Sequence, residues 1–210
     1  MDAEQRSRRN PFGMDEGCAR CDELCATRER VLHGYGDVAA DFLFVDGAPT
    51  AGAERTGVPL TGDERGERVQ HLLGLLGLSN SLPSAAEPEL ENTYLTHVAR
   101  CRHPERGPAD AEVRNCEPYL SSEVRMINPE VIVPVGELAL REVGVEYTTR
   151  PVADLDVADH HATSIRGRGF ELVPMRDPAS MTDAQFDAFL DHFEALMARD
   201  YRQTKGRRSR

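Results

Sequence analysis

Short apolar runs alternate along the chain with longer segments in which apolar residues recur at helical spacing. Apolar runs predict buried strands at residues 41–45, 130–136 and 170–174, and an alternating pattern predicts another at residues 93–98. Helical spacing predicts five helices, near residues 21–32, 69–76, 113–127, 137–143 and 183–197, and we expect Pro118 to interrupt the third of them. Because strands alternate with helices, we predict an α/β fold with a parallel sheet covered by helices on both faces.

The last predicted helix carries the clearest local signals. Thr182 and Gln185 are spaced as a capping box, and Phe186, Phe189 and Phe193 lie on one apolar stripe that we expect in the core. The first strand runs into a long loop, residues 46–62. Loops at the carboxyl ends of parallel strands usually hold the ligand sites of α/β proteins, so this loop is the first place to look for function.

Length and composition favour one main domain. The chain has 210 residues, of which 40% are hydrophobic and 29% charged. It has no apolar run near the roughly 20 residues of a membrane span, and its first residues lack the apolar region of a signal peptide. We therefore expect a cytoplasmic monomer that binds no membrane, with a loosely ordered segment at 1–17, a domain at 18–201 and a basic tail at 202–210.

The charge is unevenly distributed. The net charge is −11, although Arg202, Lys205, Arg207, Arg208 and Arg210 all lie in the last nine residues. An acidic body argues against a strongly electrostatic, salt-sensitive nucleic-acid binder. The basic tail either contacts phosphate or is a disordered solubilising end, and the second is the more common role of such a run.

Four cysteines form two spaced pairs, Cys18 with Cys21 and Cys101 with Cys116. Structural disulfides are uncommon in a reducing cytosol, so these residues indicate a metal or redox site. Four thiolates suit Zn²⁺ and a [4Fe–4S] cluster alike, and their spacing does not separate the two. Cys25 is either a fifth ligand or a buried apolar thiol, and the second is favoured.

Several short motifs follow one another in a distinctive order. They are Cys18-Ala-Arg-Cys21, Arg28, Gly34-Tyr35-Gly36, Phe44-Val45-x-x-Ala48-Pro49, Arg55-Thr56-Gly57-x-Pro59-x-x-Gly62, Tyr94-x-Thr96-x-x-Arg100-Cys101-Arg102, Cys116-x-Pro118-Tyr119-Leu120 and Pro129-x-Val131-Ile132. In order and spacing, the chain resembles the iron–sulfur uracil-DNA glycosylases of bacteria and archaea from residue 18 to about residue 181.

The resemblance implies a fold, a cofactor and a reaction. The fold is a central, mainly parallel four-stranded sheet flanked by helices. The cofactor is a structural [4Fe–4S] cluster, with the four paired cysteines as ligands. The partner is DNA, from which such enzymes flip a deoxyuridine and hydrolyse its N-glycosidic bond. The base pocket falls on Ala48, Pro49 and Leu60.

Four positions depart from the family pattern. The family turn Gly-Glu-Ala-Pro-Gly reads Asp46-Gly47-Ala48-Pro49-Thr50, so the carboxylate lies one residue earlier, where Asp46 either replaces it or forms the turn. Leu60 replaces a phenylalanine that stacks on the base, and leucine has no π-face. His97 replaces the asparagine that recognises the uracil edge, and it lacks the paired donor and acceptor of an amide.

The fourth departure is Asp177, which replaces the histidine that stabilises the departing uracil anion. A carboxylate repels that negative charge. We expect Asp46, His97 and Asp177 near one another at the carboxyl edge of the sheet, either as an acid/base set or as a satisfied polar cluster.

Two functions follow from these residues. The first is a DNA repair N-glycosylase that acts on a damaged or deaminated base with altered specificity. The second is a catalytically silent, cluster-bearing protein with a nucleic-acid-binding or structural role. Arg100, Arg102 and Arg106 lie near Cys101 and are either phosphate contacts or ordinary surface charges. His160 and His161 are better explained as part of a polar loop than as metal ligands.

Overall fold

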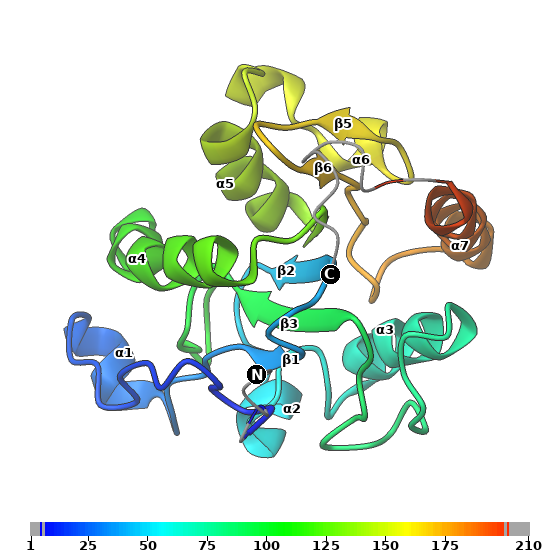
Figure 1. The fold of residues 1–210 in the computed structure, drawn as a ribbon. Coiled ribbons are helices and arrows are strands. Elements are labelled where there is room, and N and C mark those ends of the chain that lie inside the picture. Colours follow the sequence, from blue (N-terminus) through cyan, green and yellow to red (C-terminus); the bar gives the residue numbers. More distant parts are fainter. Residues whose placement is uncertain (1–4, 6, 200, 202–210) are drawn as a thin grey trace.

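The computed structural model describes residues 5, 7–199 and 201, so the predicted basic tail at 202–210 lies outside the described residues. Within these residues, six strands form one sheet in the order β1-β3-β2-β4-β6-β5 (Figure 1). They are β1 (Tyr35–Gly36), β2 (Phe42–Asp46), β3 (Thr93–His97), β4 (Val131–Val135), β5 (Ile165–Arg166) and β6 (Glu171–Leu172). The described helices are α1 (Asp22–Thr27), α2 (Ala51–Thr56), α3 (Glu64–Leu75), α4 (Asp110–Ile127), α5 (Glu137–Tyr147), α6 (Val157–His160), α7 (Asp183–Ala198) and the short 3₁₀ helix η1 (Val152–Asp154).

The centre of the sheet is parallel, as predicted. Strand β2 pairs in parallel with both β3 and β4, and β4 pairs in parallel with β6. Every residue of β2, β3 and β4 is buried. Burial on both faces explains why β2 and β4 appear in the sequence as nearly continuous apolar runs. The two edge strands, β1 and β5, are antiparallel to their neighbours and only two residues long.

Helices cover both faces of the sheet. Helices α3 and α7 pack on one face, through an apolar cluster that contains Phe44 of β2, Leu73 of α3 and Phe189 of α7. Helices α4 and α5 pack on the other face, where the cluster contains Leu43, Val124 and Leu140 (Figure 1). The predicted core role of the α7 phenylalanines is confirmed, because Phe189 and Phe193 are fully buried and Phe186 nearly so.

Some local predictions were wrong. Helix α1 ends at Thr27, well before residue 32, and the long loop after β2 contains the short helix α2. Helix α4 continues through Pro118, which we expected to interrupt it. Proline removes the hydrogen bond to the carbonyl of Arg114, but both residues lie on the exposed side of the helix, where water can bind that carbonyl.

The part of the N-terminal segment that the structure describes lies against β1. Asn10 N donates to Gly34 O at 2.9 Å, and Gly36 N donates to Arg8 O at 2.9 Å. The guanidinium of Arg9 donates to the carbonyls of Thr56 and Gly57. These bonds continue the edge of the sheet at a place where loose order was expected. No helix among the described residues is long and apolar enough to span a membrane.

Candidate active site at the carboxyl edge of the sheet

The ends of β2 and β3 bring two polar side chains together. Asp46 is the last residue of β2 and pairs in register with His97, the last residue of β3. Both are buried, with 3% of Asp46 and 0% of His97 exposed. Parallel strands end at the same sheet edge, so their terminal side chains line the usual ligand site of this fold class. His97 Nε2 lies 3.8 Å from Asp46 Oδ2, which is too far for a hydrogen bond.

An arginine that the sequence reasoning missed joins this pair. Arg65, in the first turn of α3, donates from Nη1 to Asp46 Oδ2 at 2.8 Å and from Nη2 to Asp46 Oδ1 at 2.6 Å. Gly47 N also donates to Asp46 Oδ1 at 2.7 Å. The forked pair is the strongest geometry for an arginine and a carboxylate. The sequence position of Arg65 was one indication of this pairing. A positive side chain in the first turn of a helix is unfavourable next to the positive end of the helix dipole, so it needs a nearby anion.

Arg65 also binds Asp177. Its Nε donates to Asp177 Oδ1 at 2.7 Å, and the same oxygen accepts from Ala179 N at 3.1 Å. Asp177 is half exposed, whereas Asp46 is not. The guanidinium therefore bridges the carboxylate at the end of β2 and the carboxylate of the loop before α7. The structure thus brings Asp46, His97 and Asp177 to one place, with Arg65 as the link.

His97 has no hydrogen-bond partner on either ring nitrogen among the described residues, although its side chain is fully buried. Burial lowers the pKa of His97 well below its ordinary value, and the charges of Arg100 and Arg65 lower it further. The ring is therefore neutral near pH 7, with one nitrogen as a donor and the other as an acceptor. An unmet donor and acceptor cost about 1–3 kcal/mol each, so the ring is poised to accept a polar ligand.

The two charged partners shift each other's titration. Burial raises the pKa of Asp46 above its ordinary value, and the guanidinium of Arg65 opposes this shift. Burial alone lowers the pKa of Arg65, but Asp46 and Asp177 together raise it above the ordinary arginine value. Arg65 is therefore a permanent cation inside the site.

The loop that follows β2 forms the next wall of the site. Pro49 is buried and Ala48 partly buried. Thr50 caps α2 by accepting from Ala53 N at 3.1 Å, and its hydroxyl also donates to the carboxylate of Asp63, the N-cap of α3. These bonds hold the start of the loop against the start of α3, the helix that carries Arg65.

Leu60 has an unusual backbone. Its φ is 55°, in the left-handed region, which costs a non-glycine residue roughly 1–2 kcal/mol. Gln70 Nε2 donates to the Leu60 carbonyl at 3.0 Å and holds that conformation. The Leu60 side chain is 2% exposed and packs in the apolar cluster with α3. Strain held in place by specific bonds is typical of functional sites.

Three of the four paired cysteines share one small apolar cluster, and the fourth lies near two of them. Cys18, Cys101 and Cys116 are buried, Cys21 is partly buried, and all are free thiols. Cys18, Cys21 and Cys101 share the cluster with Leu24 of α1. Burial raises the pKa of Cys116, and the nearby Cys21 and Cys18 raise it further.

Donors surround these sulfur atoms. Arg28 Nη1 donates to Cys101 Sγ at 3.4 Å, and Asn115 Nδ2 donates to Cys21 Sγ at 3.3 Å. The backbone N–H of Arg100 donates to Cys116 Sγ at 3.4 Å. Cys25 is exposed, so the favoured prediction of a buried apolar thiol was wrong. It lies in α1, and its Sγ donates to the carbonyl of Cys18 at 3.8 Å.

Comparison with known proteins identifies the family. The family model described as the uracil DNA glycosylase superfamily matches residues 33–199. The chain belongs to the uracil DNA glycosylase superfamily. The resemblance predicted from the sequence is thereby confirmed, together with the α/β fold.

Named relatives support the same family. The chain is 34% identical over 145 residues to a type-5 uracil-DNA glycosylase of Pyrobaculum aerophilum, a match that covers 60% of this chain and 64% of the relative. It is 31% identical over 137 residues to a type-4 uracil-DNA glycosylase of Archaeoglobus fulgidus, covering 63% of each. A type-5 enzyme of Thermus thermophilus is 32% identical over 157 residues, covering 65% of this chain and 71% of the relative. The chain thus spans slightly less than two thirds of the first two relatives.

In this superfamily member the four paired cysteines are candidate ligands of a thiolate-bound group. Burial raises the pKa of Cys101 to about 11, and Arg28 limits that shift. A buried thiol of this kind gives up its proton readily only to a metal that binds the thiolate. Arg28 and the N–H donors then offset the negative charge of the sulfurs. Within the described residues, however, no three His, Cys, Asp or Glu side chains lie in a group that could hold a metal ion.

A buried ion pair connects the thiol site to β3. Arg100 Nη2 donates to Glu123 Oε2 at 2.7 Å, and each side chain is 1% exposed. Glu123 also accepts from Thr96 Oγ1 at 2.6 Å and from Tyr94 Oη at 3.2 Å. Arg100 is therefore a structural residue, and the alternative that it contacts phosphate is wrong.

The remaining residues that the sequence suggested as phosphate contacts or metal ligands are bonded to neighbouring residues. Arg102 binds Glu54 at 3.4 Å, and Arg106 binds Glu112 at 2.8 Å. His160 Nε2 bonds to a backbone carbonyl at 2.8 Å, and so does His161 Nε2. The two rings use different backbone partners, which supports the polar-loop interpretation.

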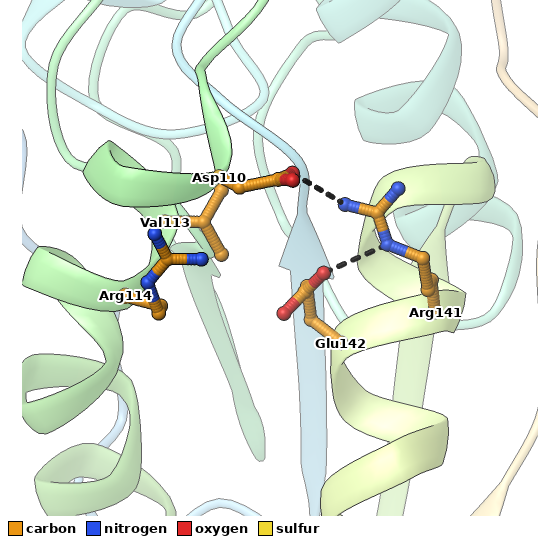
Figure 2. A pocket seen from close by; sticks show the side chains of 5 residues that line it. All are labelled: Asp110, Val113, Arg114, Arg141 and Glu142. Carbon is orange, nitrogen blue, oxygen red and sulfur yellow. Dashed lines mark hydrogen bonds and ion pairs between the residues drawn. The ribbon is translucent and has the colours of Figure 1, made fainter.

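Two grooves in the described part of the molecule lie outside this site. One, of about 330 Å³, lies between the start of α4 and the middle of α5 (Figure 2). Its charged side chains largely satisfy one another, since Arg141 binds Glu142 at 2.8 Å and approaches Asp110 at 3.7 Å. A second groove is lined by residues of α4 and α5 with Phe170. At the carboxyl edge, by contrast, the Arg65 side chain fills the space between the two carboxylates.

Proposed function

We propose that this protein is a DNA N-glycosylase that removes a damaged or deaminated base. The observation that carries the proposal is the neutral, unsatisfied ring of His97 beside the buried carboxylate of Asp46, at the sheet edge where the fold places its ligands. A base flipped out of DNA brings donors and acceptors that match such a ring. Ala48, Pro49 and Leu60 form the wall of the base pocket in this proposal.

Each polar residue has a role in the reaction. His97 donates to and accepts from the edge of the base. The N-glycosidic bond breaks and its electron pair leaves with the base, while the oxygen of a water molecule bonds to the sugar carbon and releases a proton, which then neutralises the base anion. The carboxylate of Asp46 stabilises the positive charge that develops on the sugar and orients the water. Asp177 contributes by holding the cation Arg65 in position.

The proposal includes a [4Fe–4S] cluster on Cys18, Cys21, Cys101 and Cys116. A cluster is larger than one ion and takes ligands that lie farther apart, which is compatible with the absence, in the described residues, of a group suited to a single ion. The bound group would act as a structural brace that ties α1 to the start of α4. Visible absorbance of an anaerobically purified sample tests this assignment, and a colourless protein loaded with zinc would overturn it.

DNA binding by this protein should depend weakly on salt. The net charge is −11, and Arg102 and Arg106 are already paired with carboxylates. Few phosphates are then neutralised, and the slope of log affinity against log salt is shallow. We propose that the protein acts as a monomer in the cytoplasm, and size-exclusion chromatography with and without duplex DNA checks the oligomeric state.

One observation favours the second candidate, a catalytically silent DNA-binding or structural protein. His97 and Asp46 are almost inaccessible, and Arg65, which binds Asp46, is itself only 16% exposed. A base reaches His97 only if the Arg65 side chain or the loop after β2 moves. In a silent protein this closed arrangement would simply stabilise the sheet edge.

An excision assay separates the two candidates. Duplex and single-stranded oligonucleotides that contain uracil, hypoxanthine or xanthine are incubated with the cluster-loaded protein, and released base is measured. Release of any base above that of a boiled sample rules out the silent candidate. No release from any of these substrates counts against the glycosylase.

A double variant tests the inherited pocket. His97→Asn with Asp177→His restores the residues that the family uses at these positions. We expect uracil excision to rise, because an amide recognises the uracil edge and a histidine stabilises its anion. Each single change serves as a control, and the absence of any gain from the double change would contradict the model.

A further inference from the structure

Arg65 supplies a charge that the proposed reaction otherwise lacks. The departing base carries an electron pair and therefore negative charge. The position where the family has a stabilising histidine is Asp177 in this chain, and a carboxylate there has the wrong sign. His97 is neutral, because burial keeps the pKa of its ring low. The only cation that the described residues place between Asp46 and Asp177 is Arg65.

The guanidinium of Arg65 is held by two carboxylates and still has N–H groups that make no hydrogen bond to them. Its three bonds to the two carboxylates use three of the five N–H groups of an arginine side chain. One N–H on each terminal nitrogen remains for another acceptor. Because Asp46 and Asp177 bind it from two sides, the cation is fixed before a ligand arrives.

The unsatisfied histidine lies beside the same carboxylate. Asp46 Oδ2 accepts from Arg65 Nη1 at 2.8 Å and lies 3.8 Å from His97 Nε2. The guanidinium and the imidazole therefore meet at one oxygen atom, and Arg65 is close enough to lower the pKa of the ring. The two His97 ring nitrogens, which have no hydrogen-bond partner among the described residues, lie next to a cation with unused N–H groups. This arrangement suits a planar, polar ligand that carries partial negative charge.

We propose that Arg65 is a catalytic residue that donates hydrogen bonds to the departing base and stabilises its negative charge. The inference rests on the proposed glycosylase function. Arg65 transfers no proton: the electron pair of the broken N-glycosidic bond stays on the base, and the N–H groups of the guanidinium share its charge. Asp177, in place of a histidine, positions the cation and does not contact the base.

The carboxylates of Asp46 and Asp177 limit how much Arg65 can accelerate base excision. Removing one preorganised donor to an oxyanion typically lowers a rate about 100- to 1,000-fold. Here two carboxylates already neutralise part of the cation, so we expect a smaller loss for Arg65→Gln, of about 10- to 100-fold in the single-turnover rate. Arg65→Lys keeps the positive charge but lacks the paired N–H donors of a guanidinium, so its loss of single-turnover rate should be intermediate.

The leaving group provides the sharper kinetic test. Single-turnover rates are measured on duplexes that contain uracil or 5-fluorouracil, whose anion is the more stable of the two. If Arg65 stabilises the anion, Arg65→Gln loses less rate on 5-fluorouracil than on uracil. An equal loss on both bases would overturn the proposal. The control is Arg68→Gln on the same helix, whose guanidinium binds the exposed Asp183 at 2.9 Å.

A second variant guards against a simple folding defect. Asp177 is half exposed, and Asp177→Asn retains an acceptor for Arg65 while it removes a negative charge. A less neutralised cation stabilises the base anion better, so the single-turnover rate should rise severalfold. A fall in rate would mean that the Asp177 carboxylate itself is needed, and it would overturn the proposed role of Arg65.

A binding measurement keeps this inference separate from the proposed function. Free 5-fluorouracil is titrated by calorimetry into the protein bound to a duplex with a tetrahydrofuran abasic site. It is titrated at mildly acidic pH, where the base is neutral, and at mildly alkaline pH, where it is an anion. We expect wild type and Arg68→Gln to bind the anion more tightly, and Arg65→Gln to lose that preference.

The outcomes of the two experiments are distinguishable. A preference for the anion that disappears in Arg65→Gln supports the contact even if no base is ever excised, in which case only the glycosylase function fails. Equal binding of both forms by wild type, or no binding of either, would overturn the role of Arg65 whatever the excision assay shows.

Discussion

Two arginine–carboxylate pairs lie near the end of β3, and they differ in how deeply they are buried. Arg100 and Glu123 are each 1% exposed, and Glu123 also accepts from Thr96 and Tyr94, although Arg100 Nε has no hydrogen-bond partner among the described residues. Arg65 and Asp46 are 16% and 4% exposed and lie beside His97, whose ring nitrogens have no hydrogen-bond partner in the same part of the chain. The first pair is sealed from solvent, whereas Arg65 is partly exposed and has unused N–H groups.

The difference indicates how a buried ion pair can serve either structure or chemistry. A deeply buried pair holds neighbouring segments in one geometry, as Glu123 of α4 does by accepting from Arg100 and from Thr96 of β3. A pair that lies beside polar groups without hydrogen-bond partners raises the free energy of the unbound protein. A ligand that supplies those hydrogen bonds removes this cost and therefore binds more favourably. The predictions below test this contrast, from the largest expected effect to the smallest.

Loss of Glu123 should be the most damaging change to stability. Glu123→Ala leaves Arg100 as an unpaired charge in the interior, which typically costs about 3–5 kcal/mol. Chemical denaturation of the cluster-loaded protein measures the free energy of unfolding. A loss below about 1 kcal/mol would mean that water reaches Arg100 and that the two pairs do not differ as described.

Asp46→Asn should cost less, about 1–2 kcal/mol. Arg65 retains Asp177 as a partner and lies closer to solvent than Arg100 does, so its charge is not stranded. The same denaturation experiment gives the value. A cost equal to that of Glu123→Ala would make the Arg65 pair a structural element and weaken the case for a ligand site.

The pH dependence of stability should reveal the buried histidine. The folded pKa of His97 lies below the unfolded value of about 6.5, so its contribution to stability is present above that pH and is lost as the pH falls. One such group costs about 1.4 kcal/mol by pH 5.5. His97→Gln removes this contribution. We expect the free energy of unfolding to fall less in the variant than in wild type between about pH 7.5 and pH 5.5.

Other groups are common to both proteins and cancel in that comparison. His33 and His161 also have a lowered pKa, mainly because of burial, and they add the same slope to each. Identical pH profiles for wild type and His97→Gln would contradict the buried, neutral state of His97.

The smallest effect is expected at the surface. Arg68 binds Asp183, whose side chain is fully exposed. An exposed pair contributes about 0–1 kcal/mol, so Arg68→Gln should change the free energy of unfolding by no more than that. This value sets the baseline against which the two buried pairs are compared.

Most of the fold was predictable because it depends on local pattern. The apolar runs at β2, β3 and β4 and the spacing in α3, α4 and α7 lie close to the observed elements. The short edge strands β1 and β5 were missed, since two residues carry no periodicity and pair only because a neighbouring strand offers free hydrogen-bonding groups. Helix α4 was predicted with an interruption because the sequence does not show that Pro118 faces solvent.

The candidate site was predictable only in part. The residues at the ends of β2 and β3 follow from the fold and the family motifs, so Asp46 and His97 were identified in advance. The position of Arg65 was not, because no motif links the first turn of α3 to residues 19 positions before it and 112 positions after it. Its role depends on which carboxylates the tertiary fold places within reach.

The sequence by itself determined the α/β class, the core faces of the helices, the family and the two pairs of cysteines, because each of these depends on the spacing or order of residues along the chain. Only the tertiary structure decided that Asp46 and Asp177 share one guanidinium, that His97 is buried with no hydrogen-bond partner among the described residues, and that Arg100 and Glu123 form a pair sealed from solvent. Charge pairing and burial depend on distances between segments remote in the chain, and such distances exist only after the sheet and its helices have packed.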